Sequence, residues 1–529
     1  MKLFIYIFSI ALLFTSCSND INIENSTVVV VTGKLSEQIT DDNALKITHL
    51  TISGIISGKD WNILFEMATM GSLEVLDMTN AKIIGKDGWN DDEIPQYQFS
   101  GSKTLKEVYL PISLKVIGDE AFFECSKLTQ VHFTEGIDSI AHRAFYKSGL
   151  SGELSLPSHL RVIGPQAFAG TKVTKVIVNS DIIAGKRMAQ KEDLNGNIYY
   201  ANVIYPIGGN SVFAYCDNLA EVVVKEGCKK LEIGFEDCDS LYSVILPNGL
   251  IEIGDRTGKN ENNVFRRCKS LKNISLPTSL LSIGSDVFNK TPLSEIEIPD
   301  NVEYLGSFAF SNCSLLEKVK LPKHLKQIGP SCFKECTKIT SIVIPNEVTN
   351  ISSTAFRGCT ALENVIFGDN IKTIGKSAFA ECVSLKNAVL PSKLSTLESS
   401  AFEGCINLTK VVLPNDLEEI ESSTFKDCIE LQDLYIGKST SKIGSSAFYH
   451  CIKLKKLDLP LSISAIDEYA FSYSRLNDVT VRWNTPLSIP NTTFFGTDLS
   501  KVTLNVPENT LSLYKQSPVW SSFGSIIEY

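Results

Sequence analysis

The sequence predicts a β-rich repeat solenoid, a curved array of short parallel strands and single helical turns that is capped at both ends. The first observation is the unit at residues 390–414, whose skeleton is Leu-Pro-x-x-Leu-x-x-Ile/Leu-x-x-x-Ala-Phe-x-x-Cys-x-x-Leu-x-x-Val-x. The second is the period: a Phe marks 17 copies, and from Phe310 to Phe494 the spacing is 23 residues at every step. A fixed period of roughly 20–50 residues indicates coils that pack only on their neighbours. The 529 residues therefore need no single large core.

Each piece of the unit has a physical role. The Leu-x-x-Val-x-Leu segment, as in Leu408, Val411 and Leu413, predicts a short strand. The Pro that often follows ends this strand, because Pro has no amide donor. The Leu-x-x-Ile segment (Leu417, Ile420) turns apolar groups inward from another side of the coil. The Ala-Phe-x-x-Cys segment predicts a single helical turn whose Phe fills the coil centre, so that stacked Phe side chains dominate the core.

The repeat divides the chain into four parts: a leader at 1–17, an N-terminal cap at 18–72, an array of about 17 coils at 73–505 and a C-terminal cap at 506–529. Extra residues near 181–206 and 255–263 interrupt the array. Insertions in solenoids form surface loops, which leaves open whether these two bind a ligand or are tolerated extra length. Asn195-Gly196 favours a short hairpin in the first insertion. Its Asp-x-Asn-Gly-Asn run also resembles a calcium loop, but the closing acidic residue is missing.

The leader has the pattern of a secretory signal. Lys2 precedes an apolar run at 3–14, which is shorter than the roughly 20 residues of a membrane span. The small residues that end in Cys17 resemble a bacterial lipoprotein signal, which implies that Cys17 is lipidated and begins the mature chain. The alternative is an ordinary signal in which Cys17 is incidental. The polar and acidic residues 18–20 resemble the start that directs such lipoproteins to the outer face of the cell. We therefore expect a lipid-anchored chain of the bacterial outer membrane, exposed at the cell surface.

The cysteines follow the repeat. Of 14, eleven lie three residues after the marker Phe, a position that Ser or Thr occupies in other coils, as at Ser102 and Thr497. Cysteine that exchanges with Ser or Thr behaves as a small buried donor to a backbone carbonyl. One cysteine per coil also makes a ladder and not pairs. We therefore predict free thiols, although an exported protein rich in cysteine would also be consistent with disulfides.

The unit resembles the BspA-like bacterial leucine-rich repeat over about residues 73–505. The motif Leu-Pro-x-x-Leu-x-x-Ile-Gly-x-x-Ala-Phe-x-x-Cys-x-x-Leu is complete or nearly so at residues 110–128 and 321–339. The resemblance implies a curved leucine-rich-repeat solenoid on the cell surface. It also implies binding to host matrix proteins or to other bacteria, without catalytic residues. Ligands differ among the members, so the resemblance does not identify this one.

The outward side chains of the predicted strands mark a candidate partner-binding surface. Side chains alternate along a strand, so the residue after each inward Val faces out. In five consecutive coils these residues are Val343, Ile366, Val389, Val412 and Tyr435, and the neighbouring polar row includes Asn364, Asn387 and Lys410. An apolar stripe with a polar rim is typical of interaction surfaces. β-Propensity alone would also place branched residues there.

We expect no enzyme, no cofactor and no metal site. The six His are scattered, and no zinc spacing, nucleophile elbow or phosphate loop is present. A net charge of −10 argues against a nucleic-acid partner. Two functions remain: a surface scaffold or adhesin that recognises a protein, or a glycan-binding accessory lipoprotein of a surface nutrient-uptake system. Only four Trp are present, and sugar sites favour exposed Trp or Tyr, which favours the protein partner.

Overall fold

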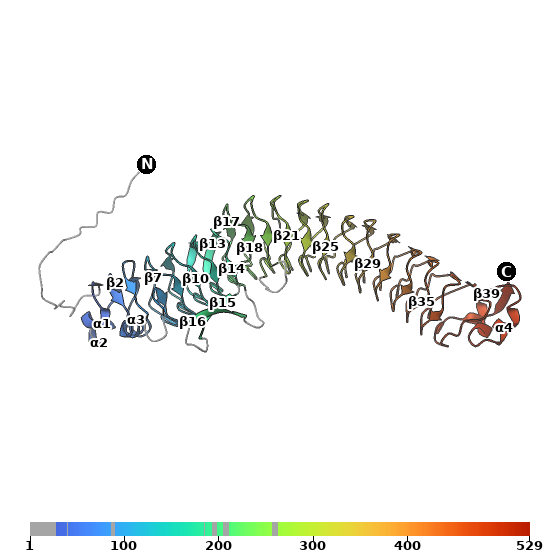
Figure 1. Cartoon of the computed structure of the whole chain (residues 1–529), viewed down its shortest axis with the longest axis horizontal. Coiled ribbons are helices and arrows are strands. Elements are labelled where there is room, and N and C mark those ends of the chain that lie inside the picture. Colours follow the sequence, from blue (N-terminus) through green and yellow to red (C-terminus); the bar gives the residue numbers. More distant parts are fainter. Residues whose placement is uncertain are drawn as a thin grey trace.

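The computed structural model describes residues 28–39, 41–85, 90–184, 186–192, 198–204, 211–255 and 263–529, and these form an arched solenoid of about 20 turns (Figure 1). Each regular coil contributes to three faces. The long-strand face carries the Leu-x-x-Val strands, the short-strand face carries the Leu-x-x-Ile strands, and the turn face carries the Ala-Phe segments. The predicted fold class is confirmed, because strands of successive coils pair in parallel on both strand faces.

The strands of the two faces recur in chain order. The long-strand face comprises β1 (Val28–Val31), β2 (His49–Ile52), β4 (Val75–Asp77), β7 (Glu107–Tyr109), β9 (Gln130–His132), β11 (Ser151–Ser155), β13 (Lys172–Val178), β17 (Glu221–Val224), β19 (Ser243–Ile245), β22 (Glu295–Glu297), β24 (Lys318–Lys320), β26 (Ser341–Val343), β28 (Asn364–Ile366), β30 (Asn387–Val389), β32 (Lys410–Val412), β34 (Asp433–Tyr435), β36 (Lys456–Leu459), β38 (Asp478–Val481), β39 (Thr503–Val506) and β40 (Ser525–Glu528). The short-strand face comprises β3 (Ile55–Ile56), β5 (Lys82–Ile83), β6 (Glu93–Ile94), β8 (Val116–Ile117), β10 (Ser139–Ile140), β12 (Val162–Ile163), β14 (Ile183–Ala184), β18 (Lys230–Leu231), β20 (Glu252–Ile253), β21 (Ser282–Ile283), β23 (Tyr304–Leu305), β25 (Gln327–Ile328), β27 (Asn350–Ile351), β29 (Thr373–Ile374), β31 (Thr396–Leu397), β33 (Glu419–Ile420), β35 (Lys442–Ile443) and β37 (Ala465–Ile466).

The turn face differs from the predicted single helical turn. In the coil of Phe379, Ser377 and Glu381 have φ of 54° and 61°, in the left-handed region that ends a right-handed helix. Ala380 and Cys382 donate to carbonyls three residues back, at 3.2 Å in both cases. The alternate backbone amides, those of Phe379 and Glu381, donate to carbonyls of the next coil at 2.8 and 2.7 Å. Consecutive tight turns therefore extend the coil-to-coil hydrogen bonding onto a third face.

The marker Phe residues form one unbroken stack through the core. Each is buried, neighbouring ring centroids lie 5.0 to 6.0 Å apart, and the planes are within 20° of parallel. Successive rings in the stack are Phe99, Phe122, Phe145, Phe168, Phe213, Phe235, Phe265, Phe288, Phe310, Phe333, Phe356, Phe379, Phe402, Phe425, Phe448, Phe471 and Phe494. The predicted central role of this residue is confirmed.

The cysteine ladder lies beside this stack. All eleven cysteines of the repeat position donate from Sγ to the carbonyl of the marker Phe one coil earlier, at 2.9 to 3.3 Å. Thr497 makes the same bond to Phe471 at 3.4 Å, which explains why Thr can replace Cys. The 13 described cysteines are buried and free, so the predicted thiol ladder is confirmed within the described chain. Cys17 lies outside the described residues.

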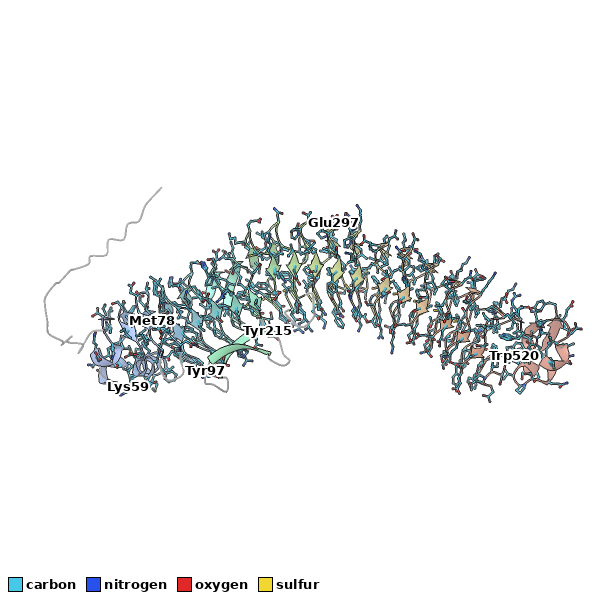
Figure 2. All side chains as sticks on the ribbon, in the orientation of Figure 1. Lys59, Met78, Tyr97, Tyr215, Glu297 and Trp520 are labelled. Carbon is cyan, nitrogen blue, oxygen red and sulfur yellow. The ribbon has the colours of Figure 1, made fainter. Side chains whose placement is uncertain are left out.

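Short helices lie at both ends of the array: α1 (Leu35–Gln38), α2 (Asp41–Ala44), α3 (Lys59–Thr69), α4 (Leu511–Gln516), and the 3-10 turns η1 (Leu499–Lys501) and η2 (Trp520–Ser522). α3 replaces the turn before Phe99, because Ser102, at the cysteine position, donates to the carbonyl of Ala68 in α3 at 2.5 Å. At the other end the buried Trp520 ring lies 6.2 Å from Phe494 and ends the stack (Figure 2).

The first insertion contains the expected pair of strands. β15 (Lys186–Glu192) and β16 (Ile198–Ile204) are antiparallel, with Lys186 opposite Ile204 and Glu192 opposite Ile198. They lie at the lower, concave edge of the arch (Figure 1). The expected turn at Asn195-Gly196 lies outside the described residues, as does most of the second insertion, at 256–262.

Candidate functional site

The predicted outward row forms a continuous apolar stripe. Its members lie on β26, β28, β30, β32 and β34, which are one five-stranded parallel sheet. Exposed fractions are 58% for Val343, 62% for Ile366, 79% for Val389, 42% for Val412 and 46% for Tyr435. We call these five side chains the apolar stripe. At ~4.8 Å per strand step it extends roughly 19 Å along the solenoid.

The register explains why these side chains lie side by side. Val343 is opposite Ile366, and Val389 is opposite Val412, which in turn is opposite Tyr435. Inward neighbours such as Ala388 and Val411 are buried. The same alternation exposes Asn364, Asn387 and Lys410 as a polar row beside the stripe. The structure therefore brings together all eight residues proposed from the sequence.

Charged residues end the stripe in both directions, which the sequence analysis missed. One coil before Val343 the row holds Lys320, which pairs with Glu297 of the coil before at 2.5 Å. One coil after Tyr435 it holds Asp458, which pairs with Arg482 at 2.7 Å. The sequence offered a signal at the first end alone, where Glu297 and Lys320 carry opposite charge at equivalent positions of neighbouring coils. Asp458 is in register with Thr480 and not with Arg482, so its ion pair could not be found from the repeat.

Two depressions adjoin the stripe. A recess of about 180 Å³ lies at its C-terminal end, lined by Lys410, Val412, Tyr435 and Lys456 among others. A groove of about 1130 Å³ lies at its N-terminal end, between residues 273–301 and 317–341. The long-strand sheet is divided there, because β22 and β24 form a separate pair between β19 and β26. The apolar stripe is therefore bordered by uneven surface at both ends.

The stripe belongs to the outer edge of the arch. Figure 2 places Glu297, of the same outward row, at the upper, convex edge. Tyr97 and Tyr215, which flank the marker Phe of their coils, lie at the lower edge, so the turn face is concave (Figure 2). Repeat proteins commonly bind ligands on extended concave surfaces. The direction of curvature was not available from the repeat pattern.

Comparison with known proteins identifies the family. The repeat described as BspA type leucine rich repeat region matches in 6 copies, over residues 92–219, 207–263, 235–361, 326–440 and 395–517. The chain belongs to this BspA-type family. A leucine-rich repeat protein of Bacteroides ovatus has a similar structure, with TM-score 0.50 and 26% identity over 71% of this chain and 85% of that one. A leucine rich cell surface protein of Faecalibacterium prausnitzii gives TM-score 0.34 and 21% identity over 72% and 85%. Curated proteins gave no match.

Within the described chain, no group of three or more His, Cys, Asp or Glu side chains is placed to hold a metal ion. The longest described helix, α3, has 11 residues, and none of the described helices has the length and apolarity needed to cross a membrane.

Proposed function

We propose that this BspA-type chain is a non-catalytic cell-surface scaffold or adhesin that binds a protein partner through the apolar stripe. The observation that supports the proposal is the set of five exposed apolar side chains on one sheet, ended by ion pairs. These side chains point away from the core, so folding does not require them to be apolar. A contiguous apolar surface with a polar rim is typical of a protein interface.

The stripe would act as the anchor of a larger interface. Stable interfaces use about 20–30 residues on each side, with most of the binding energy in a few central side chains. Asn364, Asn387 and Lys410 offer hydrogen-bonding groups along one side of the stripe. Lys410 lies opposite Asp433 in the register, so the rim presents both charges.

The location we propose is the outer membrane, with a lipid on Cys17 and the solenoid exposed at the cell surface. The leader at 1–17 and the family resemblance support it. β1 begins only 11 residues after Cys17, a length that spans at most about 40 Å. The N-terminal end of the arch would then lie near the membrane, and the stripe in the C-terminal half would extend away from it. Cys17→Ala should release the chain from the membrane fraction and abolish labelling with a radioactive fatty acid. Unchanged labelling would contradict the anchor.

The partner class that we propose is a matrix protein of the host or a surface protein of another bacterium. The competing function, a glycan-binding accessory lipoprotein of a nutrient-uptake system, would require aromatic rings for sugar stacking. Of the five side chains of the stripe, four are aliphatic and one, Tyr435, is aromatic, which supports a protein at this surface.

The test replaces Val389 and Val412 with Asp. Both side chains are exposed, so the variant should fold, while two charges at the centre of the stripe should weaken binding at least about tenfold. Binding is measured by surface plasmon resonance against purified collagen, fibronectin and laminin, and by co-aggregation with other bacteria. The matched control is Ile245→Asp, since Ile245 is 51% exposed in the same outward row of β19 but outside the stripe.

Three results would decide the proposal. Loss of binding in V389D/V412D with retention in I245D supports it. Equal binding of all three chains, or no binding to any protein or cell, contradicts it. A wild-type dimer in light scattering that V389D/V412D converts to a monomer would assign the stripe to self-association instead.

A further inference from the structure

A cluster of four aromatic side chains, three of them exposed and one half-buried, lies on the turn face near the C-terminal end, outside the apolar stripe. Tyr449, Tyr469, Tyr473 and Phe495 come from the turns of three consecutive coils, whose marker residues are Phe448, Phe471 and Phe494. Tyr469 is 36% exposed, Tyr473 41% and Phe495 52%. We call these four side chains the aromatic cluster.

The rings contact one another through edges and faces. The Tyr473 centroid lies 5.3 Å from Tyr449 and 5.7 Å from Phe495, with interplanar angles of 72° and 81°. Tyr469 lies 6.2 Å from Phe495 at 79°. Successive rings are therefore nearly perpendicular, which leaves ring faces turned in different directions.

The repeat itself shows that folding does not require aromatic residues at these positions. Two residues before the marker Phe, the preceding coils carry Ser377, Ser400, Ser423 and Ser446 where this coil has Tyr469. Tyr469 and Tyr473 have φ of 60° and 56°, a conformation that bulky residues rarely adopt. Small or polar side chains occupy these positions in most other coils, and the aromatic ones at Tyr97, Tyr215 and Phe308 have no ring partner among the described residues. The gathering of four rings in three consecutive coils therefore calls for another explanation.

The polar groups of the cluster are also arranged for a ligand. Among the described residues, the hydroxyls of Tyr449, Tyr469 and Tyr473 have no hydrogen-bond partner. His450, adjacent to Tyr449, hydrogen-bonds to Asp427 at 2.8 Å, so this carboxylate is already occupied. Ring faces beside free hydroxyls match the alternation of C–H faces and hydroxyl groups on a sugar.

We propose that the aromatic cluster is a binding site for a neutral carbohydrate, separate from the protein-binding stripe. The pyranose C–H faces would stack on the rings, and the tyrosine hydroxyls would bond the sugar hydroxyls. Asp467 and Glu468 directly precede Tyr469, and the Asp427 amide donates to the Tyr449 carbonyl at 2.9 Å. The whole chain carries −10, so an anionic glycan is disfavoured. The cluster belongs to the turn face, whose concave side Figure 2 marks by Tyr97 and Tyr215, and an extended chain of sugars can follow the axis of the solenoid there.

The test is affinity electrophoresis of the whole protein through gels that contain an α-glucan, a β-glucan, a mannan or a xylan, together with a glycan array. Polygalacturonate serves as the anionic comparison. We expect retardation by at least one neutral glycan, an association constant about tenfold or more lower in Y473A/F495A, and a smaller loss in Y473F. The control is Y97A/Y215A: these tyrosines are 51% and 54% exposed on the same face, and neither has a ring partner among the described residues. Tyr215 holds the coil position of Tyr473, and Tyr97 holds that of Tyr469.

The stripe variant V389D/V412D separates the two proposals, because it should keep full glycan binding. Glycan binding that Y473A/F495A leaves unchanged would overturn the inference, as would the absence of binding to every neutral glycan. Loss of a protein or basic-peptide ligand in Y473A/F495A, without any sugar affinity in the wild type, would reassign the cluster to a polypeptide. Circular dichroism of each variant checks the fold.

Discussion

The regular coils from Phe310 to Phe494 and the interrupted coils from Phe168 to Phe288 share one interior but differ at the surface. Stacked Phe centroids are 5.3 to 5.7 Å apart in the regular coils and 5.1 to 6.0 Å apart in the interrupted coils. The long-strand face is one five-stranded sheet from β26 to β34, but it is divided between β19 and β22. Extra length is thus absorbed outside the core, because each turn supplies one Phe whatever its length.

The electrostatic contacts of the two regions also differ. In the interrupted coils the Glu236 carboxylate is only 5% exposed and lies 2.7 Å from Arg267, with Asn263 donating to it at 3.0 Å. In the regular coils the pairs are exposed, as for Lys386 and Glu363 at 2.9 Å with 57% and 46% exposure. Removal of one partner of a buried ion pair leaves the other charge buried without compensation, whereas water screens the charges of an exposed pair. We therefore expect single substitutions to have different costs in the two regions.

Phe379→Ala should have the largest effect. Removal of a buried Phe side chain costs about 3–5 kcal/mol of unfolding free energy. Phe265→Ala is the comparison, because its neighbours lie 6.0 and 5.7 Å away against 5.3 and 5.4 Å for Phe379. Weaker ring contacts should make its cost smaller by up to ~1 kcal/mol. Urea unfolding with hydrogen exchange of the flanking coils measures both. A larger cost at Phe265 would show that spacing does not determine the stacking energy.

Arg267→Met should be the next most damaging. It leaves the buried Glu236 with Asn263 and with the more distant Arg266, whose Nη1 lies 3.6 Å from Oε1 of Glu236, while Asp237 loses a partner at 2.8 Å. Breaking a fully buried pair costs about 3–5 kcal/mol, and the 33% exposure of Arg267 reduces our expectation to roughly 2 kcal/mol. Glu236→Gln in the same background should restore part of the loss, since it removes a buried charge that only Arg266, at 3.6 Å, still offsets. Failure of this rescue would mean that Arg267 acts through packing.

The thiol ladder should make stability depend on alkaline pH. Burial raises the pKa of Cys359 and of Cys405 to about 12 from 9.0. Below pH 9 these thiols are protonated in both states and their contribution is fully present. As pH rises from about 9 towards 12 the unfolded chain loses the proton first, so stability falls by up to ~1.4 kcal/mol per pH unit for each thiol.

Urea midpoints at pH 8, 10 and 11 measure this slope. Ellman's reagent at pH 8 should detect almost no thiol before unfolding and the 13 described cysteines afterwards. Few reactive thiols after unfolding would show disulfides and contradict the ladder. Cys359→Ser should lower the alkaline slope, because serine has no comparable titration.

The sequence predicts the features that recur in every coil. It does not predict the features that depend on how one coil is positioned against the next. The marker Phe and its Cys can be recognised in the sequence because both recur at a fixed spacing. The acceptor of each Cys, the Phe carbonyl one coil earlier, depends on the relative position of two coils. The positive φ of Ser377 and Glu381 could not be predicted either, because ordinary polar residues stand at these two positions. The stripe was predictable because its residues share one position per coil, whereas the aromatic cluster combines three positions and could be seen only in the structure.

Two glycines at the same coil position allow the cost of backbone strain to be distinguished from the effect of displacing a ring of the aromatic cluster. Gly101 and Gly496 each lie two residues after a marker Phe and both have φ of 75°. A Cβ on Gly101 would meet nothing within 4 Å, whereas one on Gly496 would lie 2.6 Å from Cδ1 of Tyr473. Gly101→Ala should cost about 1 kcal/mol or less from backbone strain alone. Gly496→Ala should cost more and reduce neutral-glycan binding by displacing the Tyr473 ring. If the two substitutions had equal effects on stability and on glycan binding, the absence of a side chain at Gly496 would not be what positions the Tyr473 ring.

The exposed ion pairs of the regular coils should have the smallest effect. A double-mutant cycle of Lys386→Ala and Glu363→Ala should give a coupling energy of about 0.2–1 kcal/mol, because solvent screens both side chains. The coupling should decrease further at about 1 M salt, where the Debye length is only ~3 Å. The same cycle on Arg267 and Glu236 should give a larger coupling with weaker salt dependence, since Glu236 is buried. Equal coupling energies would show that burial does not separate the two regions. A larger value for the exposed pair would assign the stability of the regular coils to their surface charges as well as to the Phe stack.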